Sequence, residues 1–209
     1  MQFRPTLIIG LGGSGTFVVR RLKKRLRRLV QGEVPPAVQL LAFDTDAQKS
    51  DEHLEELTPS EFHRLSNFPG NVYVTATAKA QNPAIAQFWQ YKNLVPDFIQ
   101  DGAKQRPPVG RLALFVRFDD VVRNISDSVT RMFRSLPGYT PPPNIRSVDV
   151  YVIGSSCGGT GAGMFFDIAN LSRQLIAQSA LEAILQGHVF LPSCFSGTQV
   201  ALRSIQTNA

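Results

Sequence analysis

Two glycine-rich segments have the residue types and spacing that phosphate chemistry needs. The first is Gly-Leu-Gly-Gly-Ser-Gly at residues 10–15, and the second is Gly-Ser-Ser-Cys-Gly-Gly-Thr-Gly-Ala-Gly at residues 154–163. Each follows an apolar, strand-like run and precedes a helical pattern. Glycines at such a turn let backbone N–H groups approach a phosphate, and the helix N-terminus adds partial positive charge. Each segment therefore predicts a phosphate cradle.

The first segment alone leaves the ligand open. It fits the G-x-G-x-x-G fingerprint of dinucleotide sites, and Asp44 follows the second predicted strand, where an acidic residue can hold a ribose. An NAD-dependent, Rossmann-type enzyme using residues 10–15 and Asp44 is therefore one alternative. The second segment favours another arrangement, because two helix N-termini of one parallel sheet can converge on a single polyphosphate. A turn that only lets a helix pack closely is the simpler alternative for residues 154–163.

The elements that position these segments alternate along the chain. Apolar runs predict strands, and a spacing of three to four residues between apolar side chains predicts helices. This alternation predicts an α/β fold, a doubly wound, Rossmann-like parallel sheet with helices on both faces. The predicted strands are residues 6–9, 38–43, 148–153 and 187–191, and the helices beside the glycine segments are residues 17–30 and 165–180.

The middle of the chain is less regular, and residues 51–110 read as an insert-like region within one domain of residues 1–209. Proline pairs and turn residues mark the ends of its short elements. The predictions are helical turns at 52–57 and 59–65, a strand at 72–74, a short helix at 84–90 that carries Trp89, a long helix at 110–136, and a stiff connector at residues 141–143.

The second glycine segment resembles the GGTG(T/S)G signature of the tubulin and FtsZ family. Further matches follow in the same order: residues 10–15 are similar to the first glycine loop of FtsZ, residues 44–48 to its Asn-Thr-Asp-Ala-Gln, and residues 102–111 to its Gly-Ala-Gly-Ala-Asn-Pro-Glu-Val-Gly-Arg. Residues 191–193 and 208–209 match the tubulin segments Met-Pro-Ser and Asn-Ala. The resemblance implies a tubulin/FtsZ-like GTPase domain that binds GTP or GDP with Mg²⁺.

The resemblance also implies roles for individual residues. Backbone N–H groups would contact the α- and β-phosphates, a basic loop would face the γ-phosphate and sense its loss, and a carboxylate would lie near Mg²⁺, through water. The phosphate-binding residues are Gly12, Gly13, Ser14, Gly15 and Thr16 on one side and Gly158, Gly159, Thr160 and Gly161 on the other. The γ-phosphate loop is Ala103, Lys104 and Gln105, the metal residue is Asp46 with Asp44 beside it, and Ser193 and Ser196 approach the ribose.

Departures from the family pattern limit these implications. Asp44 replaces an Asn, Thr16 occupies the place of an Asn near the base, and Lys104 and Arg106 make the γ-phosphate loop more basic. The added cations either tighten triphosphate binding or point to solvent, and the choice between guanine and adenine stays open. In the family, the base-gripping residues and the water-positioning acids lie on later segments. We therefore expect residues 1–209 to be truncated before the central helix and C-terminal domain, and to hydrolyse GTP poorly alone.

The resemblance further implies head-to-tail assembly into a homo-polymer, a contact that gives filaments when the rotation does not close. Composition fits one domain: 209 residues, 43% hydrophobic, with two cysteines and a net charge of +6. No apolar run is long enough for a membrane span, so we expect a cytoplasmic protein. The three histidines do not have zinc-binding spacing, and Cys157 has no histidine near it in sequence to make it a nucleophile.

The excess of positive charge is concentrated at residues 20–28, where seven of nine residues are Lys or Arg. With Leu22, Leu26 and Leu29 as the buried stripe, these cations would cover a solvated helix face. Contact with nucleic acid, an anionic membrane or an acidic partner is the alternative, and would make the chain a basic interaction module. No aromatic residue is interleaved with the cations, which disfavours nucleic acid.

Overall fold

The computed structural model describes residues 3–90, 98–134 and 144–195. Within them, a parallel sheet of five strands has the order β3-β2-β1-β6-β7. The central strands are apolar and buried on both faces, as parallel strands covered by helices are. The strands are β1 Thr6–Leu11, β2 Val38–Asp44, β3 Phe62–Arg64, β6 Ser147–Ser155 and β7 Glu182–Phe190.

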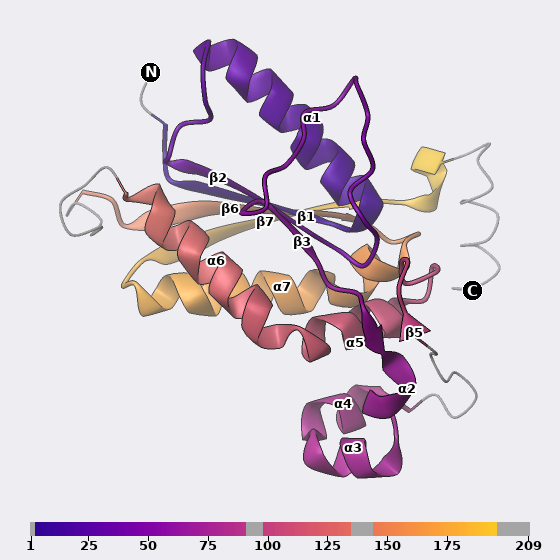
Figure 1. Cartoon of the computed structure of the whole chain (residues 1–209). Helices are drawn as coiled ribbons and strands as arrows, with labels where there is room; N and C mark the ends of the chain where they lie inside the picture. The colour runs from indigo at the N-terminus through magenta and orange to yellow at the C-terminus, as the bar shows by residue number, and fades with distance from the viewer. Residues whose placement is uncertain (1–2, 91–97, 135–143, 196–209) are drawn as a thin grey trace.

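Helices cover both faces of this sheet, as predicted (Figure 1). Helix α1, Gly12–Val30, lies on one face. Helices α5, Pro107–Val116, α6, Phe118–Met132, and α7, Gly159–Gln178, lie on the other. The described residues form one hydrophobic cluster on each side, a small one under α1 and a larger one under α5, α6 and α7. The α/β, doubly wound fold predicted from the sequence is confirmed.

The order of the strands places a topological switch point between β1 and β6. From β1 the chain moves outward to β2 and β3 on one side, and later to β6 and β7 on the other. Gly10 of β1 is therefore paired with Ala42 of β2 and with Ile153 of β6. In open α/β sheets, ligands bind outside the carboxyl ends of the strands at such a point. Both glycine segments follow strands that end there.

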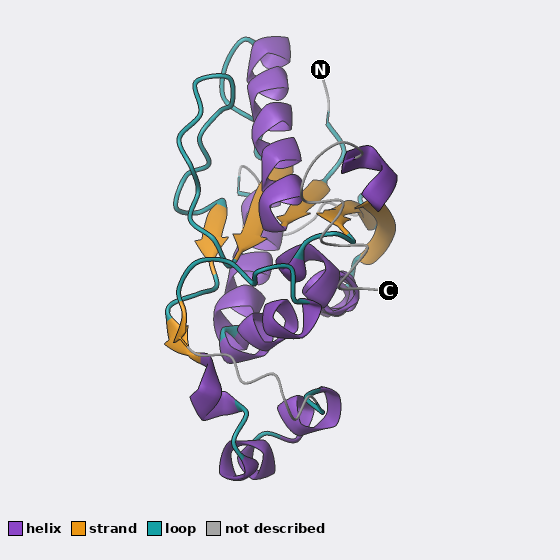
Figure 2. Ribbon diagram, turned by 90° about the vertical axis from the view of Figure 1, so that its right-hand side faces the viewer, coloured by secondary structure: helices purple, strands orange, loops and turns teal. Residues whose placement is uncertain are grey.

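A small second region lies at one end of the molecule, away from the main sheet (Figures 1 and 2). Strands β4, Phe68–Pro69, and β5, Phe98–Ile99, form an antiparallel pair. Short helices follow β4: α2 Gly70–Tyr73, α3 Ala76–Gln81 and α4 Pro83–Phe88. Trp89, directly after α4, is only 2% exposed and belongs to the larger core. The Phe88 ring stacks on Phe115 of α5, with 5.1 Å between centroids, so this region is tied to α5.

Several predicted elements of the middle region were wrong. The long helix at 110–136 is two helices, α5 and α6, which break at Arg117, whose guanidinium donates to the carbonyls of Ser66 and Asn67. Residues 72–74 are not a strand, because α2 extends to Tyr73 and Val74 caps it. The helical turn predicted at residues 52–57 is absent: residues 52–53 form a non-helical turn and residues 55–57 have no regular structure. Residues 59–65 contain strand β3 instead of a second helical turn. Residues 62–64 form a strand because they pair with β2, where Phe62 lies opposite Ala42.

The boundaries of three other elements also differ. Helices α1 and α7 begin at Gly12 and Gly159, not at residues 17 and 165, so the glycine residues themselves form the first turns. Strand β7 begins at Glu182 instead of residue 187, and its exposed, mixed side chains explain why its apolar pattern is weak. The predicted buried stripe is also wrong at Leu29, which is 59% exposed, while Val19 is fully buried.

The predicted connector at residues 141–143 lies outside the described residues. No helix in the described ranges has the length and apolar character that crossing a membrane requires.

Candidate functional site

A cavity of about 360 Å³ opens at the carboxyl ends of β1, β2 and β6, at the switch point. Its volume lies in the range of small-ligand pockets. Residues from five distant parts of the chain surround it. The lining residues are Leu11, Gly12, Gly13, Ser14, Asp44, Asp46, Gly102, Gln105, Ser155, Cys157, Gly158, Gly159, Thr160, Gly161 and Phe195.

The N-termini of α1 and α7 both face this cavity. Leu11 and Gly158 occupy the N-cap positions, and neither provides a side-chain hydrogen bond to its own helix. The first-turn N–H groups of a helix have no carbonyl partner within the helix and carry the positive end of its dipole. The two turns are adjacent, since a Cβ built on Gly12 would lie 3.2 Å from the backbone nitrogen of Gly161. Two positive helix ends therefore meet in one space, which suits an anion with several phosphates.

Gly13 and Gly158 differ from the other glycines of the two turns. A Cβ built on either one would meet no protein atom within 4 Å among the described residues. The packing of the protein therefore does not require glycine at these positions, and neither has a positive φ. Both line the cavity. Glycine there keeps the backbone accessible from the cavity side.

Asp44 is the buried acid of the site. It ends β2 and is 6% exposed, and burial raises the pKa of its carboxyl to about 6. Hydrogen bonds from the backbone of Asp46 and Thr45 and from the Thr160 side chain oppose part of this rise in pKa. The N–H of Asp46 donates to Asp44 Oδ1 at 3.2 Å. Asp46 itself is half-buried.

Thr45 joins three segments behind the cavity. Its hydroxyl shares a buried hydrogen bond of 2.6 Å with the hydroxyl of Thr160, in the first turn of α7. Its carbonyl accepts a hydrogen bond of 3.1 Å from the N–H of Gly102. The end of β2, the start of α7 and the loop at residues 102–105 are therefore held together by one residue.

The loop at residues 102–105 has an unusual backbone. Gly102, Lys104 and Gln105 have φ values of 72°, 48° and 58°. The left-handed conformation costs a non-glycine residue about 1 kcal/mol, so Lys104 and Gln105 are held there by their surroundings. Gly102 and Gln105 line the cavity, whereas Lys104 is exposed and is not among the lining residues. Ala103 is buried against Gly159, where its Cβ lies 2.7 Å from a Cβ built on that glycine.

The predicted site residues thus fall into two groups. Ten line the cavity: Gly12, Gly13, Ser14, Asp44, Asp46, Gln105, Gly158, Gly159, Thr160 and Gly161. Five others are described but are not lining residues: Gly15, Thr16, Ala103, Lys104 and Ser193.

For three of these five residues, the structure shows why they do not line the cavity. Gly15 is packed against the carbonyl of Ile153, Thr16 is buried with its hydroxyl unpartnered within the described ranges, and Ser193 is exposed on the 3₁₀ helix Pro192–Phe195. Ser196 lies outside the described residues.

Sequence reasoning missed several residues of the site. Leu11, Gly102, Ser155, Cys157 and Phe195 line the cavity, and Thr45 supports it from behind. The available signals were the glycine segments for Leu11, Ser155 and Cys157, the Asp-Thr-Asp motif for Thr45 and the matched segment 102–111 for Gly102. Phe195 had no such signal. The Ser155 hydroxyl accepts the N–H of Cys157 at 3.0 Å, which shapes the turn. Cys157 is 1% exposed, and no histidine lines the cavity in the described part of the chain.

The charges of the lining residues favour a metal–phosphate ligand over a bare anion. Asp44 and Asp46 are acidic, and the lining residues that the structure describes include no Lys or Arg. Mg²⁺ is usually held by one or two carboxylates together with phosphate oxygens and water. The two carboxylates fit that donor set. Within the described ranges, this cavity included, no group of three or more His, Cys, Asp or Glu side chains is placed to hold a metal ion.

Comparison with known proteins agrees with this arrangement. The family model described as "Tubulin like" matches residues 7–209. No curated protein matches the chain closely enough to be reported. The matched range includes both glycine segments, Asp44 and the loop at residues 102–105. The chain therefore belongs to the tubulin-like family, within the tubulin/FtsZ superfamily.

Proposed function

We propose that the chain binds GTP or GDP with Mg²⁺ in the cavity at the ends of β1, β2 and β6. The observation that carries the proposal is the meeting of two helix N-termini, without side-chain caps in the described structure, at one topological switch point. The N–H groups of Gly12, Gly13 and Ser14 would hold phosphate from one side. Those of Gly159, Thr160 and Gly161 would hold it from the other.

The two acids of the cavity would bind the metal ion. Asp44 and Asp46 would repel a bare triphosphate, and they would instead hold Mg²⁺ directly or through water. The bound metal would neutralise phosphate charge and, in doing so, would also favour the ionised form of Asp44. Gln105 and Gly102, which also line the cavity, would face the terminal phosphate. Lys104 has no assigned contact with the nucleotide.

Direct titration tests this proposal. Fluorescently labelled GTP, ATP and NAD would be titrated with the protein, with Mg²⁺ and with a chelator. We expect GTP to bind in the presence of Mg²⁺ and its affinity to fall when the metal is removed. A preference for NAD would support the Rossmann-type alternative, in which Asp44 holds a ribose. If the protein binds none of the three ligands, nucleotide binding is contradicted.

Glycine substitutions test the location of the site. Gly13→Ala and Gly158→Ala add a Cβ that meets no described protein atom within 4 Å, so both variants should fold normally. Each Cβ would enter the cavity and should lower nucleotide affinity by roughly 10-fold or more. Gly32→Ala is the matched control, because Gly32 also has open space around it, its nearest neighbour being the Val30 carbonyl at 3.9 Å, and lies outside the cavity. Unchanged affinity in both cavity variants would move the nucleotide elsewhere.

We also propose that the nucleotide governs head-to-tail self-assembly and that hydrolysis needs acidic residues from outside residues 1–209. Both statements rest on family membership. In the family, a later acidic loop completes the site of a neighbouring subunit. Sedimentation and phosphate release, measured with GTP and with GDP on the chain and on any longer form, test this. Rapid GTP hydrolysis by residues 1–209 at a concentration too low for assembly would contradict it.

A further inference from the structure

The cations of α1 divide into two sets. Arg20, Lys23 and Arg27 turn toward the loop at residues 49–61 and form hydrogen bonds with it. Arg20 donates to the carbonyls of Glu55 and Lys49 at 3.0 and 2.8 Å. Lys23 Nζ lies 2.7 Å from Glu61 Oε2, and Arg27 pairs with Glu33 at 2.6 Å and also with Glu55. These cations hold the loop against the helix, so they are structural.

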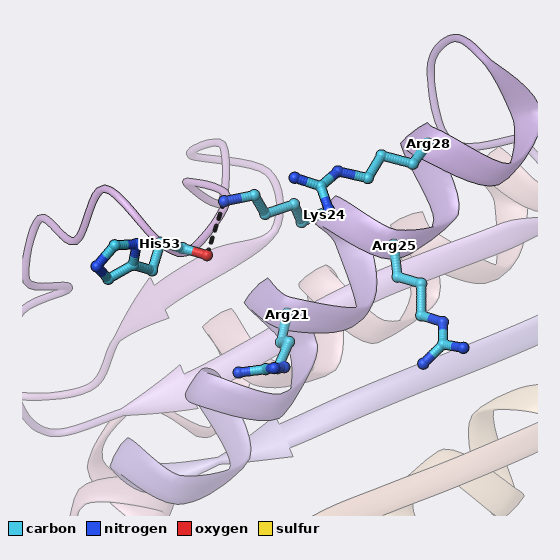
Figure 3. Close-up of a pocket in the computed structure, with 5 residues that line it drawn as sticks. All are labelled: Arg21, Lys24, Arg25, Arg28 and His53. Atoms are coloured by element: carbon cyan, nitrogen blue, oxygen red, sulfur yellow. Dashed lines mark hydrogen bonds between the residues drawn. The ribbon is translucent and has the colours of Figure 1, made fainter.

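The second set is Arg21, Lys24, Arg25 and Arg28, which with His53 line a pocket of about 600 Å³ (Figure 3). Lys24 donates to the carbonyl of His53 at 2.8 Å. Arg21, Arg25 and Arg28 are exposed and have no ion pair or side-chain hydrogen bond within the described ranges. Lys24 thus also helps to hold the loop, whereas Arg21, Arg25 and Arg28 are the free cations of this set and are not needed to hold the fold.

The free cations spread over a surface instead of converging on a point. In Figure 3, Arg21 and Arg25 point in different directions, and Arg25 points away from His53. With 100° of rotation per residue, Arg21, Lys24, Arg25 and Arg28 fall within an arc of about 100° on one helix face. A small anion would contact only one or two of them. The arrangement suits an extended surface that carries many negative charges.

Large apolar side chains lie at the two ends of this face. Phe17 is 46% exposed and lies one turn before Arg21, and Leu29 is 59% exposed and lies one turn after Arg25. Helix α1 is the outer layer on its side of the sheet, so no described element covers this face (Figures 1 and 2). Exposed cations combined with Phe and Leu on a surface helix are the composition that binds anionic lipid interfaces.

We propose that this face of α1, formed by Phe17, Arg21, Lys24, Arg25, Arg28 and Leu29, docks on an anionic lipid bilayer. The cations would lie at the level of the lipid headgroups, and Phe17 and Leu29 would enter the apolar boundary. Phe17 and Leu29 decide against nucleic acid, which gives exposed apolar side chains no favourable environment, and no aromatic residue lies between the cations for base stacking. The carboxylate of Glu33 near this face is paired with Arg27, and that of Glu52 lies 3.6 Å from His53.

Vesicle flotation with the full chain tests the proposal. We expect binding to vesicles of phosphatidylcholine with about 30 mol% phosphatidylserine and little binding to phosphatidylcholine alone. Arg21→Gln, Arg25→Gln and Arg28→Gln together should weaken partitioning onto the anionic vesicles by roughly 100-fold. The matched control, Arg123→Gln, Arg146→Gln and Arg173→Gln, removes the same charge from exposed positions outside α1 and should retain most of the binding.

A second variant separates lipid from other polyanions. Phe17→Ser with Leu29→Ser keeps every cation and should still weaken vesicle binding, by roughly 10-fold. The same variant should bind a DNA duplex as the parent does. Circular dichroism spectra confirm that each variant is folded. Three results would overturn the proposal: no binding of the full chain to anionic vesicles, equal losses in the control triple variant, or tighter binding to DNA than to vesicles.

Discussion

The two glycine-rich turns look alike in sequence but are built against different parts of the molecule. In the first, a Cβ on Gly10 would lie 2.4 Å from the carbonyl oxygen of Gly15, and a Cβ on Gly15 would lie 2.4 Å from that of Ile153. The first turn is therefore pressed onto its own strand and onto β6. Its position therefore depends on the sheet.

The second turn is pressed onto α5 and the loop before it. A Cβ on Gly159 would lie 2.6 Å from the nitrogen of Arg106, and one on Gly163 would lie 2.2 Å from the carbonyl oxygen of Pro107. Arg111 of α5 and Asp167 of α7 add a two-pronged ion pair, with N–O distances of 2.7 and 2.9 Å. A displacement of residues 102–111 would therefore act on the second turn first.

The comparison also corrects a simple interpretation of the motifs. Close packing accounts for Gly10, Gly15, Gly159 and Gly163. For these four glycines, the simpler alternative of a turn that only lets a helix pack closely is therefore sufficient. Gly13 and Gly158 are the positions in the two turns where glycine has no packing role among the described residues. A glycine-rich motif thus contains two kinds of glycine, and only the surroundings distinguish them.

The largest effect should come from a packing glycine of the second turn. Gly163→Ala places a Cβ against the backbone of Pro107, which cannot move as a flexible side chain would. We expect the free energy of unfolding to fall by about 3–4 kcal/mol, measured by urea denaturation. Gly158→Ala, five residues earlier, should cost less than about 1 kcal/mol. If the free energy of unfolding falls equally in the two variants, close packing does not distinguish Gly163 from Gly158.

The acid between the two turns should give the next effect. Because burial raises the pKa of Asp44 to about 6, the folded state holds this proton more tightly than the unfolded state, whose value is 3.8. Stability from this group is therefore full below about pH 4 and is lost as pH rises through about 6. Asp44→Asn should raise the free energy of unfolding by about 3 kcal/mol above that range and by little below it.

Denaturation curves across this pH range, without nucleotide, measure the difference between Asp44→Asn and the parent. If Asp44→Asn raises the free energy of unfolding equally at all pH values, burial of the ionised Asp44 carboxylate does not cause the gain. Addition of Mg²⁺ and nucleotide should shrink the gain if Asp44 faces the metal, because the cation would compensate the buried carboxylate.

The smallest effect should come from the link between β2 and the second turn. Thr160→Val removes one partner of the buried hydroxyl pair, leaves the Thr45 hydroxyl unsatisfied and also removes the hydrogen bond from Thr160 to Asp44, which together should cost about 1–2 kcal/mol. Adding Thr45→Val removes the unsatisfied group and should recover part of the loss, so a double-mutant cycle measures the coupling. Strict additivity of the two losses would mean that the second turn is held by α5 alone.

The sequence predicted the sheet and the cavity better than the region between them. Apolar runs located β1, β2 and β6, and the glycine segments located the two helix starts that meet there. The residues between 51 and 110 were predicted less well, because their elements are only two to six residues long and depend on tertiary pairing. Phe62 becomes part of a strand only because β2 offers it an edge.

Local pattern alone thus determined the fold class, the strand-to-helix turns and the family, because hydrophobic period and glycine placement are properties of neighbouring residues. The tertiary structure decided which glycines face a ligand, which cations of α1 hold a loop and which remain free, and that Thr45 joins three segments. These outcomes depend on contacts between residues that are tens of positions apart in the chain. Packing brings those atoms together, and no local pattern records it.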